Sequence, residues 1–209
     1  MKNVILSIDM SDRLCKVAQM RHPDPNADRQ EAILNAAFHA FSIYGYRRVT
    51  MDDIARGAGM SRSALYLHYR NKEDIFRSLA ARYFEEADRD FAAALTAPDQ
   101  TAAQALQAAF IAKDGKFMEA VLGTPHGREL LDAGLSVTDD LAAAGEARLE
   151  DHLTQWFAGF DRGEDASEPR QLAQTLLASL KGLKVTAQGM THYRAGQAVL
   201  ARVFALAVA

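Results

Sequence analysis

The hydrophobic residues of this chain recur at helical spacing soon after residue 28. Ile33, Ala37 and Phe41 lie at positions i, i+4 and i+8, which fall on one face of a helix. Gly45 follows this pattern at the place where a helix end favours a residue that tolerates a positive φ. The pattern predicts a first helix over residues 28–44.

The next segment predicts two short helices joined by a tight turn. Thr50 precedes the first helix and Ser61 precedes the second, and both residue types are preferred at helix N-caps. Gly59 supplies the turn, and Leu65 is the inward-facing anchor of the second helix, which we place at residues 62–69. Two short helices separated by such a glycine turn form a helix-turn-helix, whose second helix fits the DNA major groove. The segment is therefore predicted to bind DNA.

A long helix is predicted directly after this segment. Asn71 is its N-cap, Asp74 stands at the third helical position as in a variant capping box, and the pattern continues to Leu95. About two dozen residues, at a rise of ~1.5 Å each, span ~35 Å. A helix of this length must reach beyond a small DNA-binding head into a second domain.

The rest of the chain is rich in Ala, Leu, Gln and Glu and has no alternating β-branched run, so helices are predicted throughout. The expected fold class is all-α. Turn signals separate approximate helices at 101–122, 126–135, 138–160, 168–189 and 191–208. The chain divides into an N-terminal extension expected to be disordered (1–27), a helix-turn-helix domain (28–77) and a helical body (78–209).

Basic charge is concentrated where the helix-turn-helix lies. Residues 47–72 contain six basic and two acidic side chains, whereas the whole chain has a net charge of −3. Residues 78–209 contain 12 basic and 18 acidic side chains, which argues against DNA wrapping around the body. No apolar run approaches the ~18–20 residues of a membrane span. The N-terminus is too weak for a secretory signal, and the single cysteine, Cys15, suits a reducing compartment, so we expect a cytoplasmic protein.

From Arg29 to Tyr83 the sequence resembles the tetracycline-repressor-type (TetR/AcrR) transcriptional regulators. The positions that carry the resemblance are Thr50, Ile54-Ala55, Ala58-Gly59, Ser61, Leu65-Tyr66, His68-Tyr69 and Lys72-Glu73. The resemblance implies a three-helix DNA-binding head followed by an all-helical ligand-binding and dimerisation domain. It also implies a homodimeric regulator, expected to be a repressor, that binds a pseudo-palindromic operator in double-stranded DNA. A small-molecule effector would release it.

The expected DNA contacts lie in and around the second short helix. Arg62, Ser63 and Tyr66 stand early and outward on that helix and are candidates for reading base edges, although Arg62 could equally contact a phosphate. By resemblance, Tyr66 and His68 contact phosphates, and Lys72 reaches a phosphate from the start of the long helix. The full candidate set is Arg47, Arg48, Thr50, Ser61, Arg62, Ser63, Tyr66, His68 and Lys72.

Two interpretations are open for the last two helices. Each carries a repeating apolar pattern, consisting of Leu172, Leu176, Leu180 and Leu183 in one and Val199, Val203 and Leu206 in the other. The resemblance implies that this region forms the dimer through an antiparallel helix pair. Alternatively, these side chains only close the core of their own domain.

The resemblance also implies that some residues in the middle of the body line an effector cavity. The candidates are Phe110, Phe117, Met118, Val121, His126, His152, Trp156 and Phe160. The alternative function is a constitutive DNA-binding adaptor whose body binds a protein partner instead of a small molecule. An enzyme is not expected, because the glycine-rich stretch at 57–62 follows a helix and completes neither a phosphate-binding nor a nucleophile motif. No metal or cofactor is expected, because the six histidines have no metal-binding spacing.

Two interpretations also compete for the N-terminal extension. Its last part, from Pro23 to Asn26, is a turn-rich linker. The extension could be an arm that touches DNA. Alternatively, Met20 is the true initiator and residues 1–19 are not translated.

Overall fold

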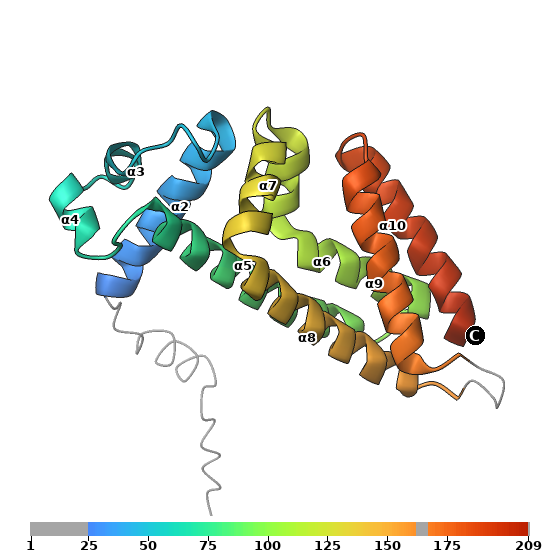
Figure 1. Cartoon of the computed structure of the whole chain (residues 1–209). Coiled ribbons are helices and arrows are strands. Elements are labelled where there is room, and N and C mark those ends of the chain that lie inside the picture. The colour runs from blue at the N-terminus through green and yellow to red at the C-terminus, as the bar shows by residue number, and fades with distance from the viewer. Residues whose placement is uncertain (1–24, 162–166, 209) are drawn as a thin grey trace, which may run out of the picture.

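A computed structural model describes residues 25–161 and 167–208, which form an elongated assembly of helices without a strand (Figure 1). The head consists of α2 (Pro25–Tyr44), α3 (Met51–Gly57) and α4 (Arg62–Tyr66). The expected all-α fold, with a helix-turn-helix near its N-terminal end, is confirmed.

The long helix α5 (Lys72–Leu95) runs from the head into the body (Figure 1). The body contains α6 (Ala102–Gly123), α7 (Gly127–Val137), α8 (Asp139–Ala158), α9 (Pro169–Thr186) and α10 (Met190–Ala205), followed by the short 3-10 helix η1 (Leu206–Val208). Helices α9 and α10 pack against each other at the end of the molecule farthest from the head. The predicted long helix therefore joins the two parts of the molecule.

The head closes around a single apolar core. Ile33 and Phe41 of α2, Ile54 of α3 and Leu65 of α4 are all completely buried there. Burying each such side chain contributes about 1.5–3 kcal/mol to the free energy of folding. Tyr69 is also buried in this core. The core holds α3 and α4 at a fixed angle to each other.

A second core fills the body and includes two of the leucines with the repeating pattern. Leu176 is 0% exposed and Leu180 is 3% exposed, and Leu172 packs against the same core. For these leucines the second interpretation is correct, because they close the core of their own domain. In contrast, Val199, Val203 and Leu206 are about half exposed or more.

Helix α7 belongs to the body in sequence but packs against the head. Leu130 is buried in the head core, and the Glu129 carboxylate accepts a hydrogen bond of 2.7 Å from the backbone N–H of Arg47. On the same side, the Arg77 guanidinium of α5 pairs with Asp140 at the start of α8, at 2.7 Å. The head is therefore attached to the body through α7 as well as through α5, and α5 is in turn tied to the start of α8.

Several predicted helix ends shift in the structure. Helix α4 ends at Tyr66 and not at Tyr69; beyond it the N–H groups of Leu67 and His68 bond to the carbonyls three residues back, at Ala64 and Leu65, as in a turn. Helix α2 begins at Pro25, so residues 25–27 belong to the head, and proline is well tolerated in a first helical turn. Residues 1–24, which include the possible DNA-binding arm and Met20, lie outside the described residues.

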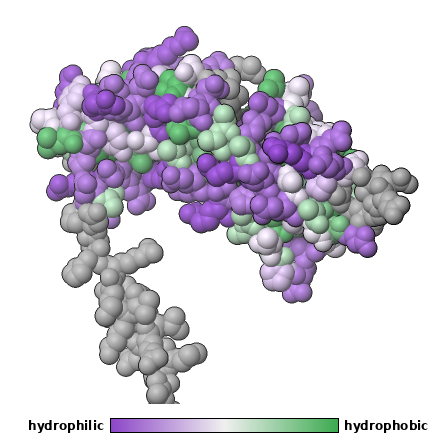
Figure 2. Space-filling model, turned by 60° about the horizontal axis from the view of Figure 1, so that its bottom comes forward, coloured by the Kyte–Doolittle hydropathy of each residue, from purple (hydrophilic) through white to green (hydrophobic). Residues whose placement is uncertain are grey.

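The surface of the molecule is mostly hydrophilic on the face shown in Figure 2, and hydrophobic side chains appear there only in small, separate patches. Within the ranges that the structure describes, no helix is both long and apolar enough to cross a membrane.

Candidate DNA-binding site

The first helix of the motif is fixed by a capping box. The Thr50 hydroxyl accepts a hydrogen bond from the backbone N–H of Asp53 at 3.3 Å, and the Asp53 carboxylate accepts one from the backbone N–H of Thr50 at 3.0 Å. The hydrogen bond from the Thr50 hydroxyl, followed by that from its backbone N–H, lowers the pKa of Asp53. Thr50 therefore serves primarily to start α3, as its position in the sequence predicts.

The turn between α3 and α4 needs the glycine that the sequence supplies. Gly59 has a φ of +67°, a conformation that other residues rarely adopt. The chain then enters α4 at Ser61, whose hydroxyl accepts a hydrogen bond from the backbone N–H of Ala64 at 3.2 Å. The Ser63 hydroxyl lies 3.0 Å from that of Ser61. The predicted N-cap and turn residues thus have the expected roles.

Helix α4 has a buried face and an exposed face. Leu65 anchors it in the head core, whereas Arg62, Ser63 and Tyr66 are exposed. Tyr66 retains 43% of its surface. Because the exposed side chains come from the first turns of a helix held rigidly by its neighbours, they can enter a DNA groove without rearrangement of the core.

Arg62 is held in position by two neighbours. Its guanidinium lies 3.2 Å from the Asp52 carboxylate of α3 and donates to the Tyr66 hydroxyl at 3.4 Å. These contacts, with the Tyr66 hydrogen bond first, raise the pKa of Arg62. The ion pair is exposed, and exposed pairs contribute only about 0–1 kcal/mol. Arg62 can therefore exchange Asp52 for a guanine or a phosphate at little cost.

Lys72 has a structural role that the sequence did not reveal. Its ammonium donates to the carbonyl oxygens of Tyr46, Arg47 and Val49 at 2.7, 3.2 and 2.9 Å. It also lies 4.6 Å from the centre of the Tyr46 ring. Burial lowers the pKa of Lys72. All three N–H bonds of the ammonium are in use, so a phosphate contact through Lys72 stays a prediction that requires it to leave one carbonyl.

The remaining candidates lie around the same edge of the head. The Arg47 and Arg48 side chains are exposed in the loop between α2 and α3. His68 is partly buried and borders a hollow with Asp28 and Arg29 of α2. The nine predicted residues thus come from the α2–α3 loop, the motif itself and the start of α5.

The residues proposed to bind an effector lie in separate clusters of the described structure, and their binding of a ligand stays a prediction. Phe110 and Met118 are completely buried in two different clusters. Trp156 and Phe160 pack against each other at a ring distance of 4.8 Å, and the Trp156 indole donates to the Leu95 carbonyl.

The other members of this set have partners of their own. The histidines at 126 and 152 lie beside Glu129 and Asp88 at 3.6 and 3.0 Å. Phe117 lines a cleft of about 470 Å³ between α2, α5 and α6. The side chain of Val121 lies outside the described part of the chain.

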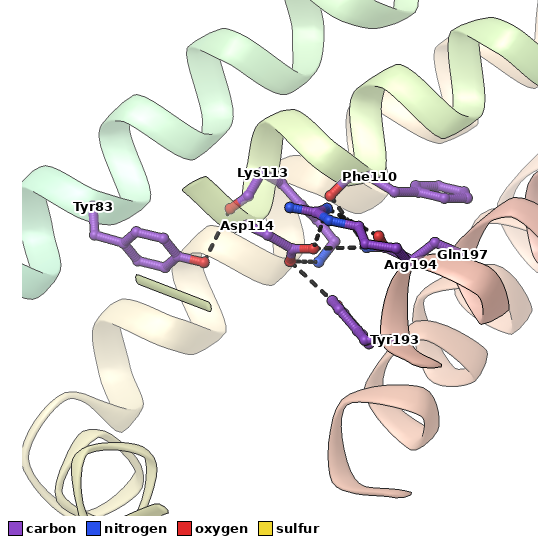
Figure 3. A network of polar contacts seen from close by, with 7 residues as sticks. All are labelled: Tyr83, Phe110, Lys113, Asp114, Tyr193, Arg194 and Gln197. Atoms are coloured by element: carbon purple, nitrogen blue, oxygen red, sulfur yellow. Dashed lines mark hydrogen bonds and ion pairs between the residues drawn. The ribbon is translucent and has the colours of Figure 1, made fainter. Parts of the chain in front are cut away.

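The body instead contains a polar network that sequence reasoning missed (Figure 3). The Asp114 carboxylate is completely buried and accepts from Lys113 at 2.6 Å and from Gln197 at 2.6 Å. It also accepts from the Tyr193 hydroxyl at 3.2 Å and from Arg194 at 3.4 Å. Burial, followed by the negative charge of Asp114, raises the pKa of Tyr193. The network joins α6 to α10.

One signal in the sequence could have revealed this network. Asp114 lies four residues after Phe110 and four residues before Met118, so its carboxylate falls on the apolar face of a helix.

Comparison with known proteins places the motif in a family. Residues 33–79 match the bacterial regulatory proteins of the tetR family. The transcriptional repressor BepR of Brucella suis is 43% identical over 56 residues, which is 27% of this chain and 27% of BepR. The uncharacterised regulator YhgD of Bacillus subtilis is 34% identical over 59 residues, or 28% of this chain and 31% of YhgD. The matches thus cover less than a third of these relatives.

The fold matches over a much larger part of the chain. A tetR-family regulator from Mesorhizobium loti has a TM-score of 0.64 at 20% identity, covering 86% of this chain and 96% of that one. SmeT, the repressor of the multidrug efflux pump SmeDEF of Stenotrophomonas maltophilia, has a TM-score of 0.62 at 24% identity, covering 85% and 88%. At these identities the likeness shows the fold. Together with the motif match at residues 33–79, this fold supports a transcriptional regulator of the tetR type.

Proposed function

We propose that this protein is a transcriptional repressor that binds a pseudo-palindromic operator as a homodimer and is released by a small molecule. The observation that carries the proposal is the exposed face of α4, where Arg62, Ser63 and Tyr66 project from a capped helix-turn-helix. The head carries the basic excess of the chain, which suits a DNA backbone.

The proposed contacts divide into two kinds. Arg62 and Ser63 lie at the start of α4 and would read base edges, because the first turn of a recognition helix enters the major groove. Tyr66, Arg47 and Arg48 would contact phosphates and fix the register of the head on the duplex. His68 and Lys72 would contribute at the edge of the same surface.

The proposed dimer surface is the exposed face of the last helices. Val199, Val203 and Leu206 are exposed apolar side chains on one side of α10 and η1, whereas the leucines of α9 are occupied in the core. Two copies related by a two-fold axis would present two α4 helices to successive turns of the major groove, about 34–36 Å apart.

The contacts of α7 support a route from the body to the head. Glu129 bonds to the backbone of Arg47, which lies in the loop before α3, and Leu130 is part of the head core. A ligand that prefers a different position of α7 would therefore shift the head and change the spacing of the two α4 helices. Such a ligand acts only through its preference for the form that does not bind DNA.

The names of similar proteins support repression. BepR and SmeT are both named as repressors. A structure of SmeT with triclosan also exists, so a protein of similar fold holds a small molecule. For the present chain, we propose both repression and release by a ligand.

Selection of DNA sites from a random pool by the purified protein tests this function. The expected result is an enriched inverted repeat whose half-sites are centred one helical turn apart. Enrichment of a single, non-repeated site would contradict the dimeric arrangement, and the absence of any enriched sequence would contradict operator binding. A ligand screen for release from the selected site then tests the sensing part. If no compound acts and a protein partner is captured instead, the chain is an adaptor.

A further inference from the structure

The cleft between head and body has walls from both parts of the molecule. It encloses about 470 Å³, which is within the range of small-molecule sites. The head supplies Glu31, Asn35 and Phe38 of α2, whereas the body supplies residues of α5 and α6. An occupant would therefore contact the DNA-binding head and the body at the same time.

The floor of the cleft is apolar and aromatic. Phe38, Leu79 and Phe117 are partly buried along it, beside Tyr83. The rings of Tyr83 and Phe117 lie 4.9 Å apart. Such a floor suits aromatic or aliphatic groups of a ligand, and the faces of the rings attract a cation.

The rim of the cleft carries an excess of negative charge. Its acidic residues are Glu31, Glu86 and Asp90, all of them exposed. Its two basic residues already have partners.

The contacts of the two basic residues show how they are used. Lys113 donates to the buried Asp114 at 2.6 Å. Arg82 donates to Asn35 at 3.1 Å and lies 3.9 Å from Glu86. Among the described residues, no ion pair is formed by Glu31. Asp90 pairs with Arg89 of α5 at 3.0 Å, so Glu31 is the rim acid whose charge is uncompensated. An anionic ligand would be repelled there, whereas a cationic one would neutralise the carboxylate.

We propose that this cleft binds amphipathic organic cations, in which a single positive charge is carried by bulky aromatic or aliphatic groups. The apolar groups pack on Phe38, Leu79 and Phe117, and the charge lies towards Glu31 and Glu86. No covalent bond is made or broken when the cation binds, so recognition depends on shape and charge.

Occupation of the cleft has a mechanical consequence that rests on the proposed function. The Arg82–Asn35 hydrogen bond crosses from α5 to α2, and a ligand on the aromatic floor lies beside this link. Separating the two helices turns the head relative to the body. A bound cation should therefore weaken operator binding, and operator DNA should weaken cation binding by the same factor.

A pair of probes with the same shape and opposite charge tests the site. We would titrate the full-length protein with tetraphenylphosphonium and, separately, with tetraphenylborate in sodium buffer, and follow the heat of binding. The expected result is binding of one phosphonium per chain, with at least tenfold weaker binding of the borate. Equal binding of both ions would overturn the charge argument, and no saturable phosphonium binding would overturn the site.

Matched variants locate the bound cation. The double variant Glu31→Gln, Glu86→Gln should bind phosphonium about five- to tenfold more weakly, whereas Glu85→Gln should bind within about twofold of the original protein. Glu85 is an exposed acid of α5 that does not line the cleft. Similar losses in both variants would show that the cation responds only to the overall charge of the protein and would overturn the proposed location.

A filled cleft gives an independent test. Ala112 lines the cleft on α6, so Ala112→Trp should abolish phosphonium binding in a protein that keeps its helical circular dichroism. Undiminished binding to this folded variant would contradict the proposal; if the variant does not fold, the rim variants decide.

Operator binding is measured separately and without any probe. A protein that binds phosphonium but no DNA would overturn the proposed function and leave the cation site in place. A protein that binds its operator but no phosphonium would overturn the cation site and leave the proposed function in place.

Discussion

In the head, the ion pair between Arg62 and Asp52 lies at the surface, with the two side chains 61% and 49% exposed. In the body, the pair between Lys113 and Asp114 lies in the interior, with side chains 10% and 0% exposed. Water screens the first pair, which therefore contributes little to stability and can be exchanged for DNA. The second pair has no such freedom, because an unpaired charge in the interior is costly.

Charged side chains therefore have different roles in the two regions: they are available to bind DNA in the head, and they stabilise the fold in the body. In the head, apolar packing and helix caps hold α4, and the charged side chains around them remain available for a ligand as large as DNA. In the body, the Asp114 network ties α6 to α10, the helix that carries the proposed dimer surface. Substitutions of polar residues in the head should thus affect DNA binding, whereas those in the body should affect stability.

The largest expected effect concerns the two apolar faces of the last helices. Leu176→Asp should destabilise the protein by more than about 5 kcal/mol, because it opens a cavity and places a carboxylate in the body core. Val203→Asp, on the exposed face of α10, should leave a folded chain that no longer dimerises. Circular dichroism and light scattering measure the two outcomes. A folded, monomeric Leu176→Asp variant would show that the leucines form the dimer surface after all.

The next effect is that of the buried carboxylate. Asp114→Ala should lower the free energy of unfolding by about 3 to 5 kcal/mol, because Lys113 and Arg194 lose their shared partner. Asp52→Ala in the head should lower it by less than about 1 kcal/mol. Urea unfolding compares the two. Equal losses would remove the distinction between surface and interior charges.

A smaller effect of opposite sign is expected at Lys184. Burial, reinforced by the positive charge of Lys113, lowers the pKa of Lys184 to about 8. An unfolded lysine binds its proton below about pH 10.4, so between about pH 8 and 10.4 the unfolded state holds more protons and stability rises with pH. Below about pH 8 both states are charged and the full penalty for burying the charge is present.

Replacing this side chain should therefore stabilise the protein. Lys184→Met should raise the free energy of unfolding at pH 7 by about 1 to 3 kcal/mol, and this gain should shrink as the pH approaches 10.4. Lys181→Met is the control, because the Lys181 side chain on the same helix is 68% exposed. Urea titrations at pH 7 and at pH 10 measure both variants, and a gain that did not depend on pH would contradict the assignment to a partly buried ammonium.

The sequence predicted best those features that depend on neighbouring residues. Thr50, Ser61 and Asn71 are N-caps as expected, because a cap is a contact between residues two or three positions apart. The burial of Leu65 and the exposure of Tyr66 follow from the helical period of a short segment.

Features that depend on packing between distant helices were not predicted. The α9 helix has apolar or small residues on more than one face, so periodicity did not show which face meets the core. The candidate effector residues lie on α6, on α8 and in the segments that follow these two helices, and their directions depend on crossing angles that the sequence does not state. The contact of Glu129 with Arg47 joins residues 82 positions apart. No sequence feature near Glu129 or near Arg47 indicates this contact.

The most direct test of the central claim is the salt dependence of operator binding. Each phosphate contact that is lost should reduce the slope of log affinity against log salt concentration by about one. We predict this reduction for Arg47→Ala and for Arg48→Ala in the head, whereas Arg170→Ala, an exposed arginine of α9 in the body, should leave the slope unchanged. An equal reduction for Arg170→Ala, or an unchanged slope for both head variants, would contradict DNA binding through the head.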